Sequence, residues 1–275
     1  MLRYLVVLSR PRFWLYLAGP VLVGAVYGAQ RPAAVATPRV AVLFTYFLLP
    51  ANVYLYGIND RFDRDTDQYN PKKEGREARY RGRLSVTLAV AASGVLLLPV
   101  AAGLPQATWG YLAGWAVLAT AYSAPPARLK ARPFLDSLSN GLYVLPGMAA
   151  YVALAGQHPP LAAVLGAWAW SMAMHTFSAV PDVEADRAAG VNTTATWLGP
   201  GRALWYCGLL WAGAALGFGL VDWRLGAALG VYPLLLAAVV GAEVSIDRAY
   251  WWYPAVNAIV GGVLTVGGLW RLVYG

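Results

Sequence analysis

Two short acidic runs contain the side chains of this chain that are best suited to metal chemistry. The first run places Asn59, Asp63 and Asp67 four residues apart, and the second repeats that spacing with Asp182 and Asp186. Residues four apart share one face of a helix, so each run is expected to present a ladder of oxygen ligands. Two facing ladders would repel each other without cations, and Mg²⁺ prefers oxygen ligands, which it usually shares with waters and substrate phosphates. The spacing therefore predicts a Mg²⁺ site formed by both runs.

The runs hold seven of the thirteen acidic residues in the chain. Asp60, Asp65 and Glu184 fall off the ladder faces, and we expect them to meet solvent at the rim or to pair with arginines. A solvated, salt-bridged loop would explain one such run equally well, but it does not explain two runs with the same spacing. An EF-hand is excluded because the turn glycine and the terminal glutamate of that motif are missing.

Basic residues flank the acidic runs, as a diphosphate ligand would require. Metal ions together with Lys and Arg side chains are the usual partners of such an anion. Positive-inside anchoring is the alternative, and it accounts for Arg81, Arg83 and Arg132. The predicted diphosphate-binding residues, besides Asn59, are Lys72, Lys73, Arg76, Tyr122, Arg128 and Lys130.

The elements that must position these residues are membrane-spanning helices. The chain is 59% hydrophobic and only 12% charged, whereas soluble domains carry about 25% charged residues. Nine apolar stretches are long enough to span a bilayer, and nine buried helices would leave a soluble protein without a polar surface. The stretches cover residues 13–30, 40–58, 84–104, 107–127, 133–157, 161–181, 203–221, 225–242 and 252–270.

The distribution of basic residues predicts the orientation. With the N-terminus in the cytoplasm and nine alternating spans, seventeen of the 21 Lys and Arg residues lie on the inner side and four on the outer side. This is a strong positive-inside bias, and it places both acidic runs in cytoplasmic loops of a cell-membrane protein. Nucleic-acid binding is not expected. The first stretch lacks the features of a cleavable signal peptide, and the single cysteine, Cys207, excludes disulfides and cysteine metal sites.

The acidic runs lie four apolar stretches apart, each at the inner end of an even-numbered stretch. This suggests an all-α membrane domain over residues 1–275, with two pseudo-repeated four-helix halves and a ninth helix. Duplicated halves with a site at their interface are common in membrane proteins. We therefore expect about nine helices around a central cavity.

These motifs resemble those of the UbiA-type intramembrane prenyltransferases. The first run is similar to the family pattern N-D-x-x-D-x-x-x-D, the second to D-x-x-x-D, and the segment from Tyr122 to Lys130 to Y-[ST]-x-P-P-x-R-x-K. The opening Ser9-Arg-Pro-Arg-Phe-Trp14 is also similar to the start of the family. The resemblance implies Mg²⁺-dependent binding of a prenyl diphosphate and transfer of its isoprenoid chain.

Within this family, residues 63–77 and 175–186 look most like lycopene elongase/hydratase proteins of carotenoid synthesis. By that resemblance the donor is dimethylallyl diphosphate and the lipophilic acceptor, taken from the membrane, is an end of lycopene. Composition and spacing do not indicate this acceptor.

The expected chemistry is ionisation of the allylic donor, with Asp63, Asp67, Asp182, Asp186 and Lys130 as the catalytic residues. The cation then needs a dry pocket with aromatic faces. Candidates for the cavity wall are Asn52, Tyr54, His175 and Phe177, with Trp170 as a further aromatic face.

Each cavity candidate also has a structural interpretation. Aromatic packing explains any one ring in a chain with 13% aromatic residues. His175 lies two helical turns before Asp182 and is either a base or a buried, hydrogen-bonded side chain. Asn52 lines the cavity or bridges helices, and Asp136 is expected to cap the fifth helix.

Three other functions compete with this hypothesis. The same fold and chemistry would serve an aromatic acid, a quinone precursor, an isoprenoid alcohol or a glycerol lipid as acceptor. A CDP-alcohol phosphotransferase is disfavoured because its D-G-x-x-A-R pattern is absent. An ion-coupled transporter is disfavoured because its acidic sites usually lie near the bilayer midplane.

Overall fold

A computed structural model describes residues 2–62 and 83–275, and these residues form helices and connecting turns without a strand. The all-α class is therefore confirmed for the described part of the chain. Within those residues, five helical segments are long and apolar enough to cross a membrane, and the count of nine is not confirmed. These segments are Pro38–Phe62, Leu84–Ala102, Leu135–Ala155, Trp223–Gly241 and Ile246–Tyr274.

The chain divides into two compact units, which we describe separately. The first unit comprises Met1–Arg128, Leu145–His158 and Gly268–Gly275. Its described α-helices are α1 (Leu2–Leu8), α2 (Trp14–Gly28), α3 (Pro32–Val35), α4 (Pro38–Leu48), α5 (Pro50–Phe62), α6 (Leu84–Val95), α7 (Leu97–Ala102), α8 (Trp109–Ser123) and α10 (Leu145–Ala155), and its 3₁₀ turns are η1 (Pro11–Phe13) and η4 (Gln106–Thr108).

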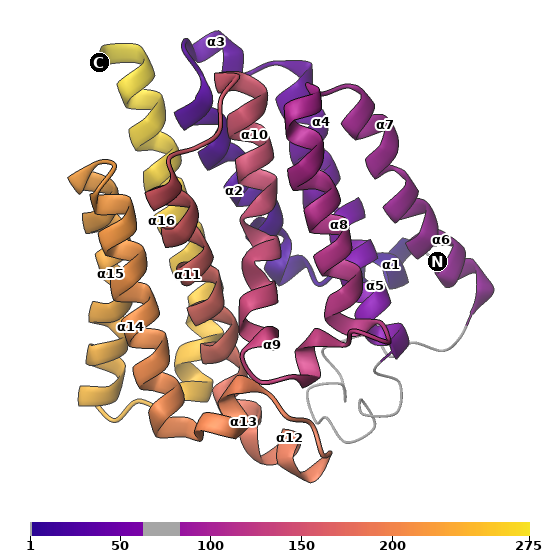
Figure 1. Cartoon of the computed structure of the whole chain (residues 1–275), viewed down its shortest axis with the longest axis vertical. Helices are drawn as coiled ribbons and strands as arrows, with labels where there is room; N and C mark the ends of the chain where they lie inside the picture. The colour runs from indigo at the N-terminus through magenta and orange to yellow at the C-terminus, as the bar shows by residue number, and fades with distance from the viewer. Residues whose placement is uncertain (1, 63–82) are drawn as a thin grey trace. The chain divides into compact units, whose positions relative to one another are not determined.

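A close crossing of α2 and α10 forms the centre of the first unit (Figure 1). A Cβ atom on Gly24 would lie 1.9 Å from the carbonyl oxygen of Gly147, and one on Gly28 would lie 2.6 Å from that of Tyr151. Small residues permit such backbone contact between membrane helices, where packing replaces the hydrophobic effect. This crossing draws α10 into the first unit.

The break between α4 and α5 is explained by Pro50, which has no amide hydrogen to continue the helix. Asn52 compensates at this break: its Nδ2 donates to the carbonyls of Phe47 at 2.8 Å and Leu48 at 3.0 Å. Asn52 is fully buried. Of the two roles expected for it, the contacts support a bridge between helices.

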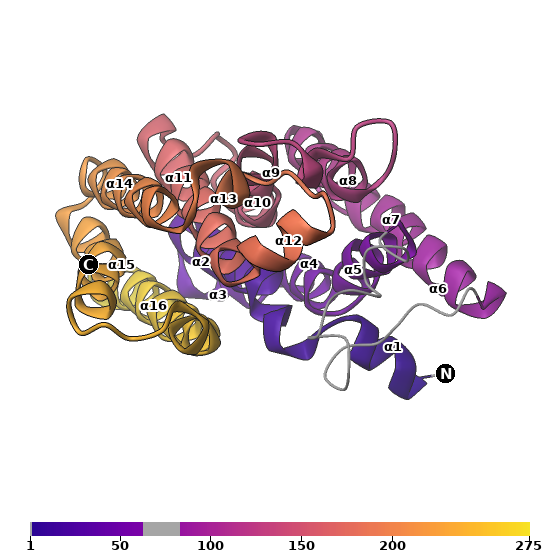
Figure 2. The same cartoon turned by 90° about the horizontal axis from the view of Figure 1, so that it is seen from below.

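The second unit comprises Leu129–Val144 and Pro159–Gly267. In it, α14 packs against both α11 and α15 (Figure 2). Its elements are η5 (Leu129–Ala131), α9 (Leu135–Leu138), η6 (Ser139–Tyr143), α11 (Leu161–Ala179), η7 (Val180–Asp182), α12 (Val183–Ala188), α13 (Thr194–Leu198), α14 (Pro200–Gly219), α15 (Trp223–Gly241) and most of α16 (Ile246–Tyr274).

The helix starts in the second unit follow the local sequence. Thr193 and Thr196 form a reciprocal capping box at α13. Asp222 caps α15 by accepting the backbone N–H of Arg224 at 2.9 Å. Gly199, at φ 76°, joins α13 to α14 in a conformation that glycine adopts without strain.

The two units do not coincide with the predicted four-helix halves. The first boundary, after Arg128, falls where the fourth apolar stretch was expected to end. However, the fifth stretch is divided, because α9 belongs to the second unit and α10 to the first.

Candidate active site

The first acidic run begins in the last turn of α5. Asn59 lies there half-buried, three residues before the helix ends at Phe62. The predicted ligands Asp63 and Asp67 lie outside the described residues. So do three predicted diphosphate-binding residues, Lys72, Lys73 and Arg76.

Asp60 departs from the expectation of a solvated rim. Only 1% of the residue is exposed, and its Oδ1 accepts a hydrogen bond from Arg10 Nη2 at 3.1 Å. The Arg10 guanidinium also lies 4.6 Å from the ring centroid of Tyr56. The alternative of arginine pairing is therefore confirmed for Asp60, and this pair ties the N-terminal segment to the end of α5.

The second acidic run lies where α11 gives way to two short helical elements. Asp182 ends η7 and Asp186 lies in α12. Both residues are half-buried, whereas Glu184 between them is exposed. The structure thus separates the two predicted ligands from Glu184, as the helical spacing requires, although α11 does not continue unbroken through the run.

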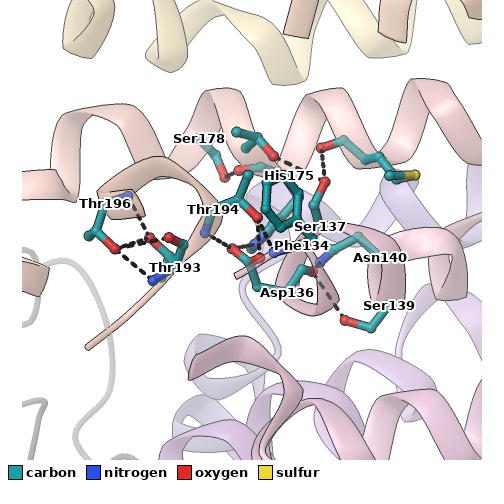
Figure 3. A network of polar contacts seen from close by, with 12 residues as sticks. Phe134, Asp136, Ser137, Ser139, Asn140, His175, Ser178, Thr193, Thr194 and Thr196 are labelled. Atoms are coloured by element: carbon teal, nitrogen blue, oxygen red, sulfur yellow. Dashed lines mark hydrogen bonds and ion pairs between the residues drawn. The ribbon is translucent and has the colours of Figure 1, made fainter. Parts of the chain in front are cut away.

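A buried polar cluster joins residues that precede and follow this second run along the chain (Figure 3). Its centre is Asp136, which is fully buried. Asp136 Oδ2 accepts the backbone N–H of Thr194 at 2.9 Å, and Oδ1 accepts the Thr194 hydroxyl. His175 Nε2 lies 3.5 Å from the same Oδ2. The cluster therefore joins α9, α11 and α13 through one carboxylate.

The expectation that Asp136 caps its own helix is wrong. Asp136 lies inside α9, and its side chain instead binds the first residue of α13. The backbone N–H of Phe134 completes the arrangement by donating to Thr194 Oγ1 at 2.8 Å. Thr194 is 58 residues away in the chain, so no local pattern indicates the contact.

The structure places the cavity candidates among well-packed neighbours. Tyr54 forms a 2.7 Å hydrogen bond with Thr120. Phe177 is fully buried, and its ring centroid lies 4.4 Å from that of Tyr253. His175 retains 15% side-chain exposure, and its Nε2 lies near Asp136 Oδ2.

The rings around Phe177 form one aromatic cluster within the second unit. Trp211 stacks on Tyr253 at 5.5 Å and on Tyr232 at 5.6 Å between centroids. Trp170 contacts Tyr232 edge-on at 5.9 Å. Stacked and edge-on rings stabilise one another beyond simple burial, so packing accounts for these residues.

The predicted basic loop begins at the end of α8, with Tyr122 half-buried in its last turn. Arg128 follows at φ 40°, an unusual conformation for a non-glycine residue. Lys130 lies in η5. Tyr122 and Arg128 belong to the first unit and Lys130 to the second.

The donor set in the described residues suits Mg²⁺. Asn59, Asp182 and Asp186 offer amide and carboxylate oxygens, which are hard ligands. Among the residues that the structure describes, no three His, Cys, Asp or Glu side chains meet closely enough to hold a metal.

One apolar segment long enough to cross a membrane, Pro38–Phe62, ends at the first acidic run, and the second run follows α11. Residues 17–259 match the model of the UbiA prenyltransferase family, and the chain belongs to this family of integral membrane prenyltransferases. The expectation from the sequence motifs is thus confirmed.

Two relatives are similar to this chain along most of their length. The chain is 62% identical over 275 residues to the lycopene elongase/hydratase of Halobacterium salinarum, covering all of both chains. It is 57% identical over 272 residues to the protein of the same name from Haloferax volcanii, covering 99% of this chain and 90% of the relative.

A solved structure supports the fold. The UbiA homologue from Archaeoglobus fulgidus, bound to DMAPP and Mg²⁺, matches with a TM-score of 0.78 at 23% identity, covering 99% of this chain and all of the other. The family match begins at residue 17 and so does not include Arg10. The sequence alone did not identify Arg10 as the partner of Asp60.

Proposed function

We propose that this chain is a Mg²⁺-dependent prenyltransferase that joins the dimethylallyl group of dimethylallyl diphosphate to an end of lycopene. One observation carries the proposal: identity of 62% along the whole length with a lycopene elongase/hydratase. The Archaeoglobus fulgidus homologue, crystallised with DMAPP and Mg²⁺, supports the choice of donor and metal.

In this proposal, the oxygen ligands on the two acidic runs hold Mg²⁺ against the donor diphosphate. The ligands are Asn59, Asp63, Asp67, Asp182 and Asp186. The metal supplies charge neutralisation of the leaving group. Cationic side chains add to it, because positive charge near the developing diphosphate stabilises the transition state. These groups, with the Tyr122 hydroxyl as a hydrogen-bond donor, are Lys72, Lys73, Arg76, Arg128 and Lys130.

Bond breaking and bond making then follow from the chemistry of an allylic donor. The carbon–oxygen bond breaks, and diphosphate leaves with the electron pair. A terminal double bond of the acceptor attacks the allylic cation and leaves a tertiary cation on the acceptor. That cation either loses a proton, which restores a double bond, or captures water and releases a proton, which forms a tertiary alcohol. His175 is the described imidazole nearest in sequence to the second acidic run, and we propose it as the proton acceptor or water-orienting group.

The membrane arrangement is part of the same proposal. We propose one domain over residues 1–275, with nine spans in two pseudo-repeated halves around a central cavity in the cell membrane. The N-terminus and both acidic runs face the cytoplasm. The uneven distribution of Lys and Arg supports this orientation. Labelling of single engineered cysteines from each side of sealed vesicles, in a Cys207→Ser background, tests it.

A transfer assay tests the function directly. Purified protein in lipid nanodiscs receives Mg²⁺, labelled dimethylallyl diphosphate and either lycopene, an aromatic acid or an isoprenoid alcohol. We expect a labelled carotenoid only when lycopene is the acceptor, and no labelled product when Mg²⁺ is chelated. Prenylation of the aromatic acid or the alcohol, with lycopene untouched, would instead support one of the alternative acceptors.

The second run offers a matched pair of variants for the metal assignment. We expect Asp182→Ala to lower turnover at least about a hundredfold, because a metal ligand is lost. Glu184→Ala removes an exposed acid from the same run and should retain turnover. Equal turnover in the two variants would refute the assignment of Asp182 as a ligand.

A further inference from the structure

We propose that Asp136 is a positioning residue that fixes the backbone on both sides of the second acidic run and so sets the affinity of Asp182 and Asp186 for Mg²⁺. This inference rests on the proposed function of that run. It adds a residue that lies outside both acidic motifs, and it depends only on contacts within the second unit.

The first part of the argument is that one carboxylate contacts the chain before and after the run. His175, on α11, lies seven residues before Asp182, and Thr194, at the start of α13, lies eight residues after Asp186. Both meet Asp136 (Figure 3). The segment from 175 to 194 is therefore closed into a loop whose ends meet at a single buried side chain.

The contacts at the Thr194 end fix direction as well as distance. Asp136 accepts both the backbone N–H and the hydroxyl of Thr194, and the Phe134 N–H donates to the same hydroxyl. Thr194 thus donates two hydrogen bonds and accepts one, and together these bonds define the orientation of the first turn of α13. A buried carboxylate that lost these partners would be costly, so the arrangement is strongly held.

A chain of hydrogen bonds continues from this point to the acidic run. Thr193 and Thr196 cap α13 reciprocally. The carbonyl of Thr196 accepts Arg187 Nη2 at 3.0 Å. Arg187 directly follows Asp186, whose own carbonyl accepts the N–H of Val191 at 2.8 Å. These hydrogen bonds connect α13 to the residue that follows Asp186 in α12.

Such support matters because metal ligands must already stand near their bound positions to bind tightly. Outer groups that orient ligands typically change metal affinity or activity by about 10- to 100-fold. Mg²⁺ tolerates little departure from octahedral geometry. Asp182 and Asp186 lie in short helical elements of three and six residues, which hold little rigidity of their own.

Two substitutions test the role of Asp136. Asp136→Asn keeps the shape but removes the charge, and Thr194→Val removes the hydroxyl without any change of charge. We expect each to weaken binding of Mn²⁺, used as a paramagnetic probe for Mg²⁺, about tenfold in an electron paramagnetic resonance titration. The half-saturating Mg²⁺ concentration for turnover should rise in parallel. At saturating Mg²⁺, kcat should change by less than about threefold.

Two control variants separate positioning from other effects. Thr194→Ser keeps the hydroxyl and should bind Mn²⁺ as the wild type does. Asp247→Asn removes an exposed acid from the same unit and should also leave the affinity unchanged. A shift in Asp136→Asn without one in Thr194→Val would indicate a purely electrostatic effect and overturn the inference, as would unchanged affinity in both.

The experiment also distinguishes this inference from the proposed function. Wild-type protein that binds Mn²⁺ but transfers no prenyl group would refute the function, and the affinities of the variants would still decide the role of Asp136. Wild-type protein that binds no Mn²⁺ would refute both. If Asp136→Asn does not fold, the uncharged Thr194→Val substitution alone decides between positioning and no effect.

Discussion

Asp60, within the first acidic run, and Asp136, outside both runs, are both buried carboxylates, but their partners differ. Asp60 is paired with a guanidinium, Arg10, which is also held against Tyr56. Asp136 is bound mainly by uncharged donors of Thr194, with His175 beside them. A permanent cation balances the charge of a carboxylate directly, whereas hydrogen bonds from uncharged donors distribute that charge over several groups. The two regions should therefore respond differently to the loss of one partner.

The largest effect is expected from breaking the pair in the first unit. Arg10→Met removes the guanidinium and leaves the Asp60 carboxylate buried without its arginine, so the free energy of unfolding should fall by about 3 kcal/mol. An unfolding titration in mixed detergent micelles measures it. The double variant Arg10→Met with Asp60→Asn should recover most of the loss, because no buried charge remains. If the double variant is as unstable as Arg10→Met, the loss of unfolding free energy does not come from the charge of Asp60.

A smaller loss of stability is expected in the second unit. Asp136→Asn keeps an acceptor oxygen for the Thr194 amide, so only part of the network is lost, and the free energy of unfolding should fall by about 1–2 kcal/mol. The same titration measures it. A loss as large as that of Arg10→Met would show that the two buried acids do not differ in the way their partners suggest.

The contact between Arg10 and the ring of Tyr56 should contribute less to the free energy of unfolding than the network of Asp136 does. Tyr56→Leu keeps an apolar side chain but removes the ring face beneath the guanidinium, and it should cost about 0.5–1 kcal/mol. Tyr56→Phe retains the ring and is the matched control. If the two substitutions cost the same, the phenol hydroxyl rather than the ring face is what matters at this position.

The smallest effect is expected at Glu184, which is exposed within the second run. Glu184→Gln should change the free energy of unfolding by less than about 0.5 kcal/mol, as is usual for surface substitutions. Its thermal unfolding should match the wild type at each Mg²⁺ concentration. A change in the Mg²⁺ dependence would mean that Glu184 contributes to the metal site.

The sequence correctly predicted the all-α class and the family, because both depend on composition and on local motifs. Asp60 and Asp136 bind partners that lie 50 and 58 residues away in the chain. Local spacing does not predict contacts over such separations. Asn52 illustrates an intermediate case. Its polarity inside an apolar stretch was compatible with a cavity wall or with a bridge between helices. The break at Pro50 and the two carbonyls that Asn52 binds became visible only in the structure.

The fifth stretch contains a helical segment long and apolar enough to cross a membrane, Leu135–Ala155, but the packing partner of its second part was not predicted. Residues 133–157 are apolar throughout most of their length and were predicted as one helix of the second half. The glycine crossing at Gly147 instead packs α10 against α2 in the first unit. Small residues within an apolar stretch mark a possible crossing, but the sequence does not identify its partner.

The crossing of α2 and α10 has a consequence for the order of biosynthesis. Gly147 follows Gly24 by roughly 120 residues. At synthesis rates of about 5–20 residues per second, α10 is therefore made roughly 6 to 25 s after α2. The first unit also includes Gly268–Gly275, and Arg271 lies 5.4 Å from the ring centroid of Tyr27 at the end of α2. The unit whose first helices are made earliest is therefore completed only when the end of α16 has left the ribosome.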